Sequence, residues 1–176
     1  MKSNKGLTAI NIVFLLAALA VAIWGLVGFE CTAGFKWALL ISIFALVFGF
    51  AYSCKGFSKS AAPFYMLFMA LLAIACVINA VAISKSGANS LGMIMQIIVF
   101  ITVIVFAVRD NTGRKASTVM MILMVAAQIV LVISTLVAGG TFGAPQLFTI
   151  DSLLLVLTAA TMVIAKYRDK KARGTN

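Results

Sequence analysis

The chain has 176 residues, of which 64% are apolar and 10% are charged, and its formal net charge is +10. A soluble domain is about 45 to 50% apolar, with roughly a quarter of its residues charged. A soluble fold of this size could not remove so much apolar side-chain area from water. The composition therefore excludes an ordinary soluble domain and predicts a protein whose solvent is lipid.

Six apolar segments run along the chain, and none of them contains Lys or Arg. A helix needs roughly 20 residues to cross a hydrocarbon core about 30 Å thick, whereas barrel strands would alternate polar and apolar residues. We therefore predict an all-α, polytopic helical membrane protein that forms a single six-helix transmembrane domain over residues 1–176. The predicted transmembrane helices are 7–28, 37–53, 64–83, 91–108, 117–137 and 148–165.

The basic residues predict the orientation of these helices. Twelve of the fourteen Lys and Arg residues lie in the two terminal segments and two alternate loops, while the intervening segments hold only Lys36 and Lys85. Short loops rich in Lys and Arg are retained in the cytoplasm. We therefore predict a multi-pass protein of the cell membrane with both termini cytoplasmic (N-in/C-in). Segments rich in Lys and Arg alternate along the chain with segments that have few basic residues. This pattern indicates membrane topology, and it argues against a continuous basic surface that binds nucleic acid.

The residue types limit the chemistry that the chain can perform. It contains no histidine, so His-based metal sites, haem ligation by His, and Ser/His or Cys/His nucleophile pairs are excluded. Cys31, Cys54 and Cys76 lie at different predicted depths, too far apart for a disulfide. We therefore predict that the protein is not an enzyme and has no catalytic residues, no metal site and no cofactor.

Small residues at four-residue spacing mark candidate packing faces. The second predicted helix carries Ala45, Gly49 and Ser53 at this spacing, and the first carries Ala18 and Ala22. In lipid such residues let helix backbones approach closely, because packing drives helix association there. We expect these faces to make tight contacts inside the bundle rather than to form a homodimer interface.

Polar side chains concentrate in the outer half of the predicted bundle. The inner half holds fewer, chiefly Asn11, with Gln128 near the midplane. Since polar groups within a membrane usually face the protein interior or a water-filled cavity, the asymmetry predicts a polar chamber open to the outside. The alternative is a set of interhelical hydrogen bonds worth well under 2 kcal/mol each. The candidate chamber residues are Asn79, Gln96, Ser134, Thr135, Asp151 and Ser152.

Asp151 is the only acidic residue within a predicted transmembrane helix. It lies about one turn from the predicted outer end of the last helix. Two interpretations remain open from the sequence. The carboxylate either belongs to the chamber, or it is a hydrated acid at a helix start, where the macrodipole favours negative charge.

The chain length, the six predicted spans and the cytoplasmic termini are similar to those of the substrate-binding subunits of energy-coupling-factor vitamin transporters. This resemblance is one of architecture, without a motif that would transfer residue roles. The concentration of polar residues in the outer half predicts a small-solute binding or transport component with a polar site in the outer half of the membrane. The alternative is a non-catalytic structural or accessory subunit of a larger membrane complex. In both cases the partner is the lipid bilayer, with a small-molecule ligand or a protein complex in addition, and not nucleic acid.

Overall fold

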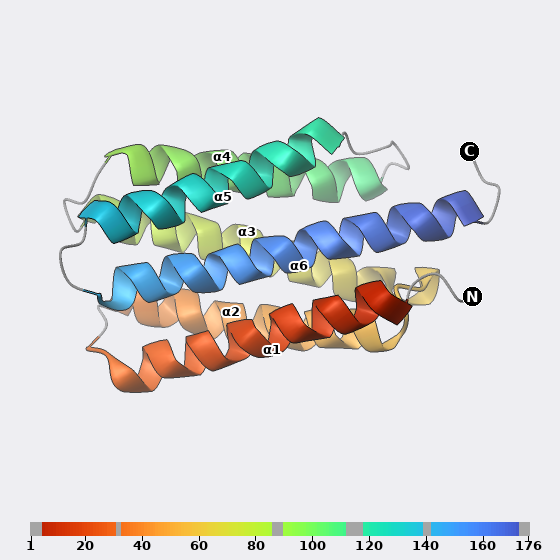
Figure 1. Cartoon of the computed structure of the whole chain (residues 1–176), viewed down its shortest axis with the longest axis horizontal. Coiled ribbons are helices and arrows are strands. Elements are labelled where there is room, and N and C mark those ends of the chain that lie inside the picture. The colour runs from red at the N-terminus through yellow and green to blue at the C-terminus, as the bar shows by residue number, and fades with distance from the viewer. Residues whose placement is uncertain (1–4, 31–32, 86–89, 112–117, 139–141, 173–176) are drawn as a thin grey trace.

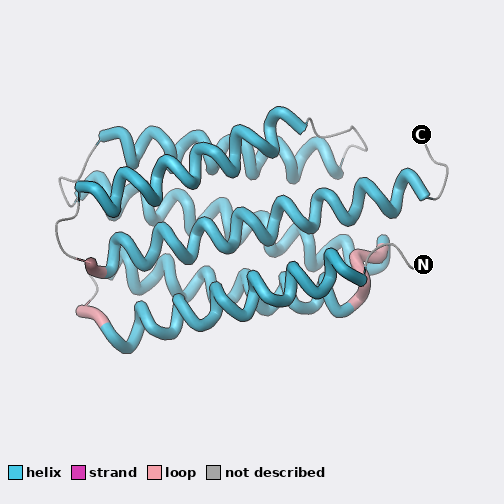
Figure 2. The backbone as a smooth tube through the Cα atoms, in the orientation of Figure 1, coloured by secondary structure: helices cyan, strands magenta, loops and turns pink. Residues whose placement is uncertain are grey.

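The computed structural model describes residues 5–30, 33–85, 90–111, 118–138 and 142–172. Six α-helices account for most of these ranges, and Figure 2 shows only helices and loops in the described part of the chain. Each helix is long and apolar enough to span a membrane, so the prediction of an all-α fold with six such helices is confirmed. The helices are α1 (Lys5–Gly28), α2 (Ala33–Cys54), α3 (Ala62–Lys85), α4 (Ser90–Asn111), α5 (Thr118–Ala138) and α6 (Ala144–Ala172).

The last helix differs most from its predicted apolar segment, because it begins four residues earlier and ends seven residues later. Pro145 lies in its first turn, where the missing N–H and fixed φ of proline are tolerated. The side-chain oxygen of Gln146 accepts a 3.0 Å hydrogen bond from the backbone N–H of Gly143 just before the helix. The apolar segment of a sequence marks only the part of a helix that lies in lipid. The helix itself can be longer, because its backbone hydrogen bonds continue into the polar residues on either side.

The six helices form two layers of three (Figure 1). One layer holds α1, α6 and α5, and the other holds α2, α3 and α4. As the middle helix of its layer, α6 contacts α1 and α5 beside it and α2 and α3 across the interface. Both termini lie at one end of the bundle. We call the half of the bundle near the termini the proximal half and the opposite half the distal half.

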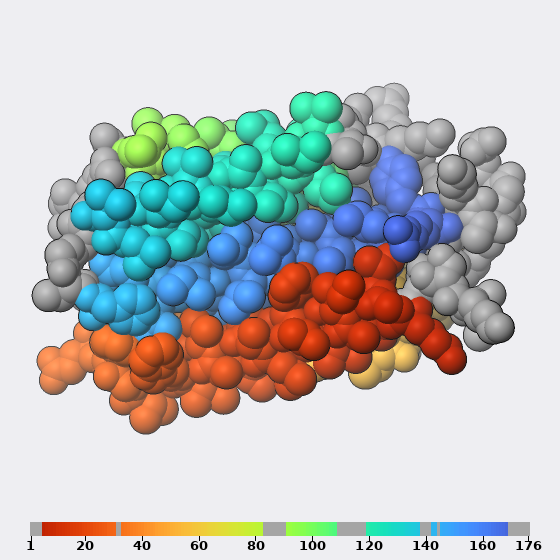
Figure 3. All heavy atoms as spheres, in the orientation of Figure 1, coloured from red at the N-terminus to blue at the C-terminus, as the bar shows by residue number. Residues whose placement is uncertain are grey.

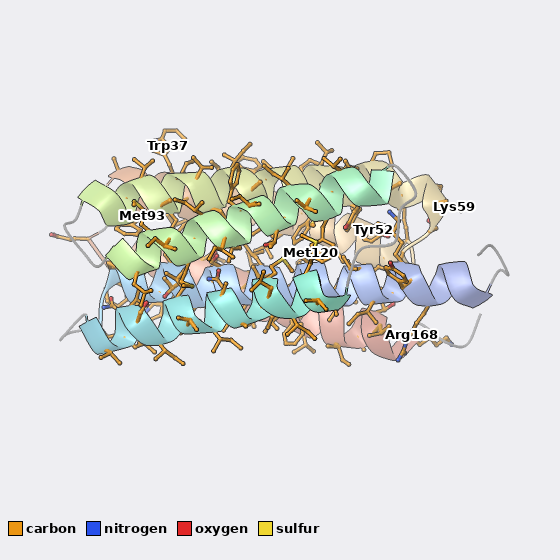
Figure 4. All side chains as sticks on the ribbon, turned by 90° about the horizontal axis from the view of Figure 1, so that it is seen from above. Trp37, Tyr52, Lys59, Met93, Met120 and Arg168 are labelled. Atoms are coloured by element: carbon orange, nitrogen blue, oxygen red, sulfur yellow. The ribbon has the colours of Figure 1, made fainter. Side chains whose placement is uncertain are left out.

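The surface of the bundle is apolar, and its interior is also mostly apolar but holds buried polar side chains. Large apolar side chains such as Val13, Phe44 and Val119 are exposed on α1 to α5, whereas α6 has none among its described side chains. Figure 3 shows α1, α6 and α5 closely packed on one face, and Trp37 points away from the bundle in Figure 4. Soluble proteins expose mostly polar side chains, so an apolar surface with polar side chains buried inside suits helices surrounded by lipid.

The connection from α2 to α3 is a tight turn at the proximal end. Gly56 and Phe57 both have positive φ, at 62° and 59°. The N–H groups of Gly56 and Phe57 donate to the carbonyl oxygens of Ser53 and Tyr52, at 2.9 and 3.2 Å. This is a Schellman motif, and the Phe57 ring packs on Tyr52 with centroids 5.3 Å apart, as its hydrophobic contact requires. The turn therefore fixes how α2 leads through the short 3₁₀ helix Lys59–Ala61 into α3.

Candidate functional site

The small-residue faces lie inside the bundle. The predicted packing residues Ala18, Ala22, Ala45, Gly49 and Ser53 are all buried. A Cβ atom on Gly49 would come within 2.8 Å of Leu15 in α1, 3.2 Å of Phe68 in α3 and 3.4 Å of Met162 in α6. Three helices therefore approach α2 at this glycine, with no space for a larger side chain.

A polar cluster in the proximal half joins α1, α2 and α6. The amide nitrogen of Asn11 donates to the hydroxyl of Ser53 at 2.6 Å, and the hydroxyl of Thr161 donates to the amide oxygen of Asn11 at 2.6 Å. Ser53 donates in turn to the carbonyl oxygen of Gly49 at 2.8 Å. Each of these side chains has a partner, so the cluster acts as interhelical packing and offers no open polar group.

The first polar contact of the distal half lies between α3 and α4. The amide nitrogen of Asn79 donates to the amide oxygen of Gln96 at 3.2 Å, and both side chains are fully buried. Gln96 also lies against the Cys76 thiol. The amide oxygen of Asn79 and the amide nitrogen of Gln96 have no hydrogen-bond partner in the described part of the chain.

The second polar contact lies between α5 and α6. The hydroxyls of Thr135 and Thr149 are 3.1 Å apart, and the amide nitrogen of Gln146 donates to the Thr135 carbonyl oxygen at 3.2 Å. The amide nitrogen of Gln128 donates to the Thr149 carbonyl oxygen at 3.2 Å. The amide oxygen of Gln128 is buried and accepts no hydrogen bond from the described residues.

The third polar contact lies between α2 and α6, where Ser42 faces Asp151. Asp151 is fully buried and lies seven residues into α6. The interpretation of Asp151 as a hydrated acid at a helix start is therefore wrong, because the helix begins earlier than predicted and turns this position into the bundle. Neither carboxylate oxygen accepts a hydrogen bond from any described residue, since the Ser42 hydroxyl donates to the Ala38 carbonyl oxygen at 3.1 Å.

Four of the six candidate chamber residues take part in these contacts: Asn79 and Gln96 in the first, Thr135 in the second and Asp151 in the third. Asn79, Gln96 and Asp151 lie six, six and seven residues from the distal ends of α3, α4 and α6, which is about 10 Å along each helix. Ser152 is buried on α6, whereas Ser134 is half-buried and donates to the Leu131 carbonyl oxygen of its own helix at 2.9 Å. Among the described residues, no hydrogen bond joins one of the three interhelical contacts to another.

Three residues of these contacts, Ser42, Gln146 and Thr149, were not among the site residues predicted from the sequence. Ser42 could have been found, because Ala38, Ser42, Ala45 and Gly49 form one small-residue face on α2, and extending the predicted packing face by one turn reaches it. Gln146 and Thr149 were missed for different reasons. Gln146 fell before the predicted start of the last helix, and Thr149 resembles many hydroxyl residues that bond only within their own helix.

A groove of about 450 Å³ runs along the outside of α3 and α4 in the distal half. Its walls are apolar and include Val77, Val81, Met93 and Ile97; Figure 4 labels Met93 toward the distal end of α4. Gln96 is its polar lining residue. The groove therefore connects the apolar surface with the contact between α3 and α4.

Comparison with known proteins gives no family: no family model, no curated protein and no solved structure matches this chain. In the part of the chain that the structure describes, no group of three or more His, Cys, Asp or Glu side chains could hold a metal ion. Among the described residues, the buried polar groups of the distal half are therefore neutral amides, hydroxyls, the Cys76 thiol and the Asp151 carboxylate.

Proposed function

We propose that this protein is a non-enzymatic membrane protein that binds a small polar solute in the distal half of its bundle, as a binding or transport component. The observation that supports this proposal is a contrast between the two halves. Asn11, Ser53 and Thr161 in the proximal half pair with one another. From the middle of the bundle into the distal half, Asn79, Gln96, Gln128 and Asp151 retain buried atoms without partners.

The energetic cost of these atoms favours a ligand. A buried polar atom without a hydrogen bond costs about 1 to 3 kcal/mol, and lipid offers no compensating water. The four residues come from four consecutive helices, α3 to α6, and all are fully buried. Interhelical hydrogen bonding alone does not account for these unpaired atoms. If the four residues served only to join helices, their polar atoms would be paired, as those of Asn11, Ser53 and Thr161 are in the proximal half. A bound polar solute would supply the missing partners.

The proposal includes an orientation for the protein. The proximal end carries Lys55, Lys59 and Lys166 near its helix ends, and short segments rich in Lys and Arg are retained in the cytoplasm. We place this end in the cytoplasm of the cell, with the distal half in the outer leaflet. The solute site would then face the extracellular side.

Native mass spectrometry of the protein purified from its own membrane tests the binding function. We expect a small molecule to accompany the wild-type chain and to be lost from Gln128→Met, which removes the unpaired amide oxygen at nearly constant volume. The matched control is Thr102→Val, because the buried Thr102 hydroxyl donates to the carbonyl oxygens of Ile98 and Val99 in its own helix and to no other described residue. If neither wild type nor control carries a solute, and a protein subunit accompanies both, the accessory function replaces this proposal.

A further inference from the structure

The carboxylate of Asp151 has no compensating charge in the described structure. Both of its oxygens are buried and accept no hydrogen bond, and no basic side chain forms an ion pair with it among the described residues. An ionised carboxylate is not tolerated in an apolar interior unless it is paired. The site is therefore incomplete as it stands, and a proton or a cationic group must complete it.

The unpaired atoms around the middle and distal half are mostly acceptors. Gln128 has only one orientation that makes a bond, because exchanging its amide atoms would set its oxygen against the Thr149 carbonyl oxygen. Asn79 and Gln96 leave one donor and one acceptor in either orientation. The Gln128 oxygen and the two Asp151 oxygens are three further acceptors without partners. Unpaired acceptors therefore outnumber unpaired donors in this part of the bundle. A ligand that completes this set must donate hydrogen bonds or carry positive charge.

Ser42 adds a neutral oxygen beside the carboxylate. Its hydroxyl proton is directed to the Ala38 carbonyl oxygen of its own helix. A hydroxyl that donates in one direction presents its lone pairs in others, so the Ser42 oxygen can contact a cation next to Asp151. Carboxylate and neutral oxygens are the ligand types that a hard cation or an ammonium group prefers.

The charge of the ligand follows from the number of carboxylates. One carboxylate balances one positive charge, whereas a divalent ion would leave an uncompensated charge in the same low-dielectric interior. The absence of any group of three or more potential metal ligands among the described residues also disfavours a divalent site. We propose that Asp151 and Ser42 bind one monovalent cationic group, either a metal ion such as Na⁺ or the protonated amine of a solute. This assignment deepens the proposed function and rests on it.

The test is the melting temperature of the full chain, purified in detergent, at constant ionic strength and neutral pH. NaCl or methylammonium chloride replaces choline chloride stepwise. Choline has the same charge but is bulky and has no N–H donor, so it controls for ionic strength. We expect a graded rise in melting temperature, because a ligand that binds only the folded state stabilises it in proportion to the logarithm of its concentration. A rise with Na⁺ alone identifies a metal ion, and a rise with methylammonium alone identifies an amine.

Two variants make the result specific to the site. Asp151→Asn should abolish the graded rise and should melt at a higher temperature than wild type in choline alone, because it removes an unpaired buried charge. Ser42→Ala should weaken the apparent cation affinity by about tenfold. Thr102→Val is its control, because the buried Thr102 hydroxyl also donates to carbonyl oxygens of its own helix, and it should leave the affinity unchanged.

The inference is overturned if wild type does not respond to either cation, or if Asp151→Asn or Ser42→Ala responds as wild type does. The site would then be closed by a proton. This failure is distinct from failure of the proposed function, because a neutral solute could still accompany wild type and be lost from Gln128→Met. Conversely, a cation response without any co-purified solute would support the cation site and leave the solute-binding function unsupported.

Discussion

The hydroxyl of Thr161 in α6 donates a 2.6 Å hydrogen bond to the amide oxygen of Asn11 in α1, 150 positions earlier in the chain. The same Asn11 side chain donates to Ser53 in α2. One amide therefore joins three helices in the proximal half. Because both ends of the amide are used, this residue should contribute to stability more than any polar group that bonds only within its own helix.

Replacing Asn11 tests this contribution. Asn11→Leu keeps a similar volume but removes both interhelical hydrogen bonds, each worth roughly 0.6 to 2 kcal/mol within a membrane. We expect the free energy of unfolding in detergent to fall by about 1 to 3 kcal/mol. Thr102→Val is the control and should cost less than half as much. Equal losses in both variants would show that the three-helix junction contributes nothing beyond local bonding.

The close approach at Gly49 gives a second prediction. Gly49→Leu places side-chain atoms where Leu15 already comes within 2.8 Å of a built Cβ, so α2 must move away from its neighbours. We expect a loss of at least about 1 to 3 kcal/mol, typical of overpacking, measured as a lower melting temperature in detergent. Val47→Leu on the same helix is the control, because Val47 is 59% exposed. Similar melting temperatures for both variants would contradict the contact.

The pair formed by Asn79 and Gln96 should show coupling. Either Asn79→Leu or Gln96→Leu alone leaves one buried amide without its partner, at a cost of about 1 to 3 kcal/mol. The double variant removes both amides, so its loss should be smaller than the sum of the single losses by about 1 kcal/mol. A double-mutant cycle of unfolding free energies measures this difference. Additive losses would indicate that the 3.2 Å contact is not energetically significant.

The orientation can be tested at Cys54, which is exposed at the proximal end of α2. In a Cys31→Ser variant, Cys54 is the accessible thiol of the described residues, because Cys76 is buried. A membrane-impermeant maleimide should label it only after the cells are permeabilised, since we place the proximal end in the cytoplasm. Labelling in intact cells would reverse the orientation. The Cys31 residue itself, predicted in an outer loop, lies outside the described residues.

The sequence by itself determined the six helices and the existence of polar residues among them. Helix number follows from segment length and apolarity, which are local properties: any uninterrupted apolar segment of about 20 residues can form a helix that satisfies its own backbone in lipid. The spacing of small residues likewise predicted a packing face on α2, and Gly49 lies where three other helices approach it.

The tertiary structure alone decided which polar groups are paired. The sequence shows Asn11 and Asp151 only as polar residues within predicted transmembrane helices. In the structure Asn11 has two side-chain partners and Asp151 has none among the described residues. Pairing depends on the rotation of each helix about its axis and on neighbours far away in the chain, such as Thr161 for Asn11. The polar residues of α6, Thr149, Asp151, Ser152, Thr158 and Thr161, are spread around the helix. They therefore do not indicate which face turns toward α2, and only the packing of that helix between its neighbours brings Asp151 to Ser42.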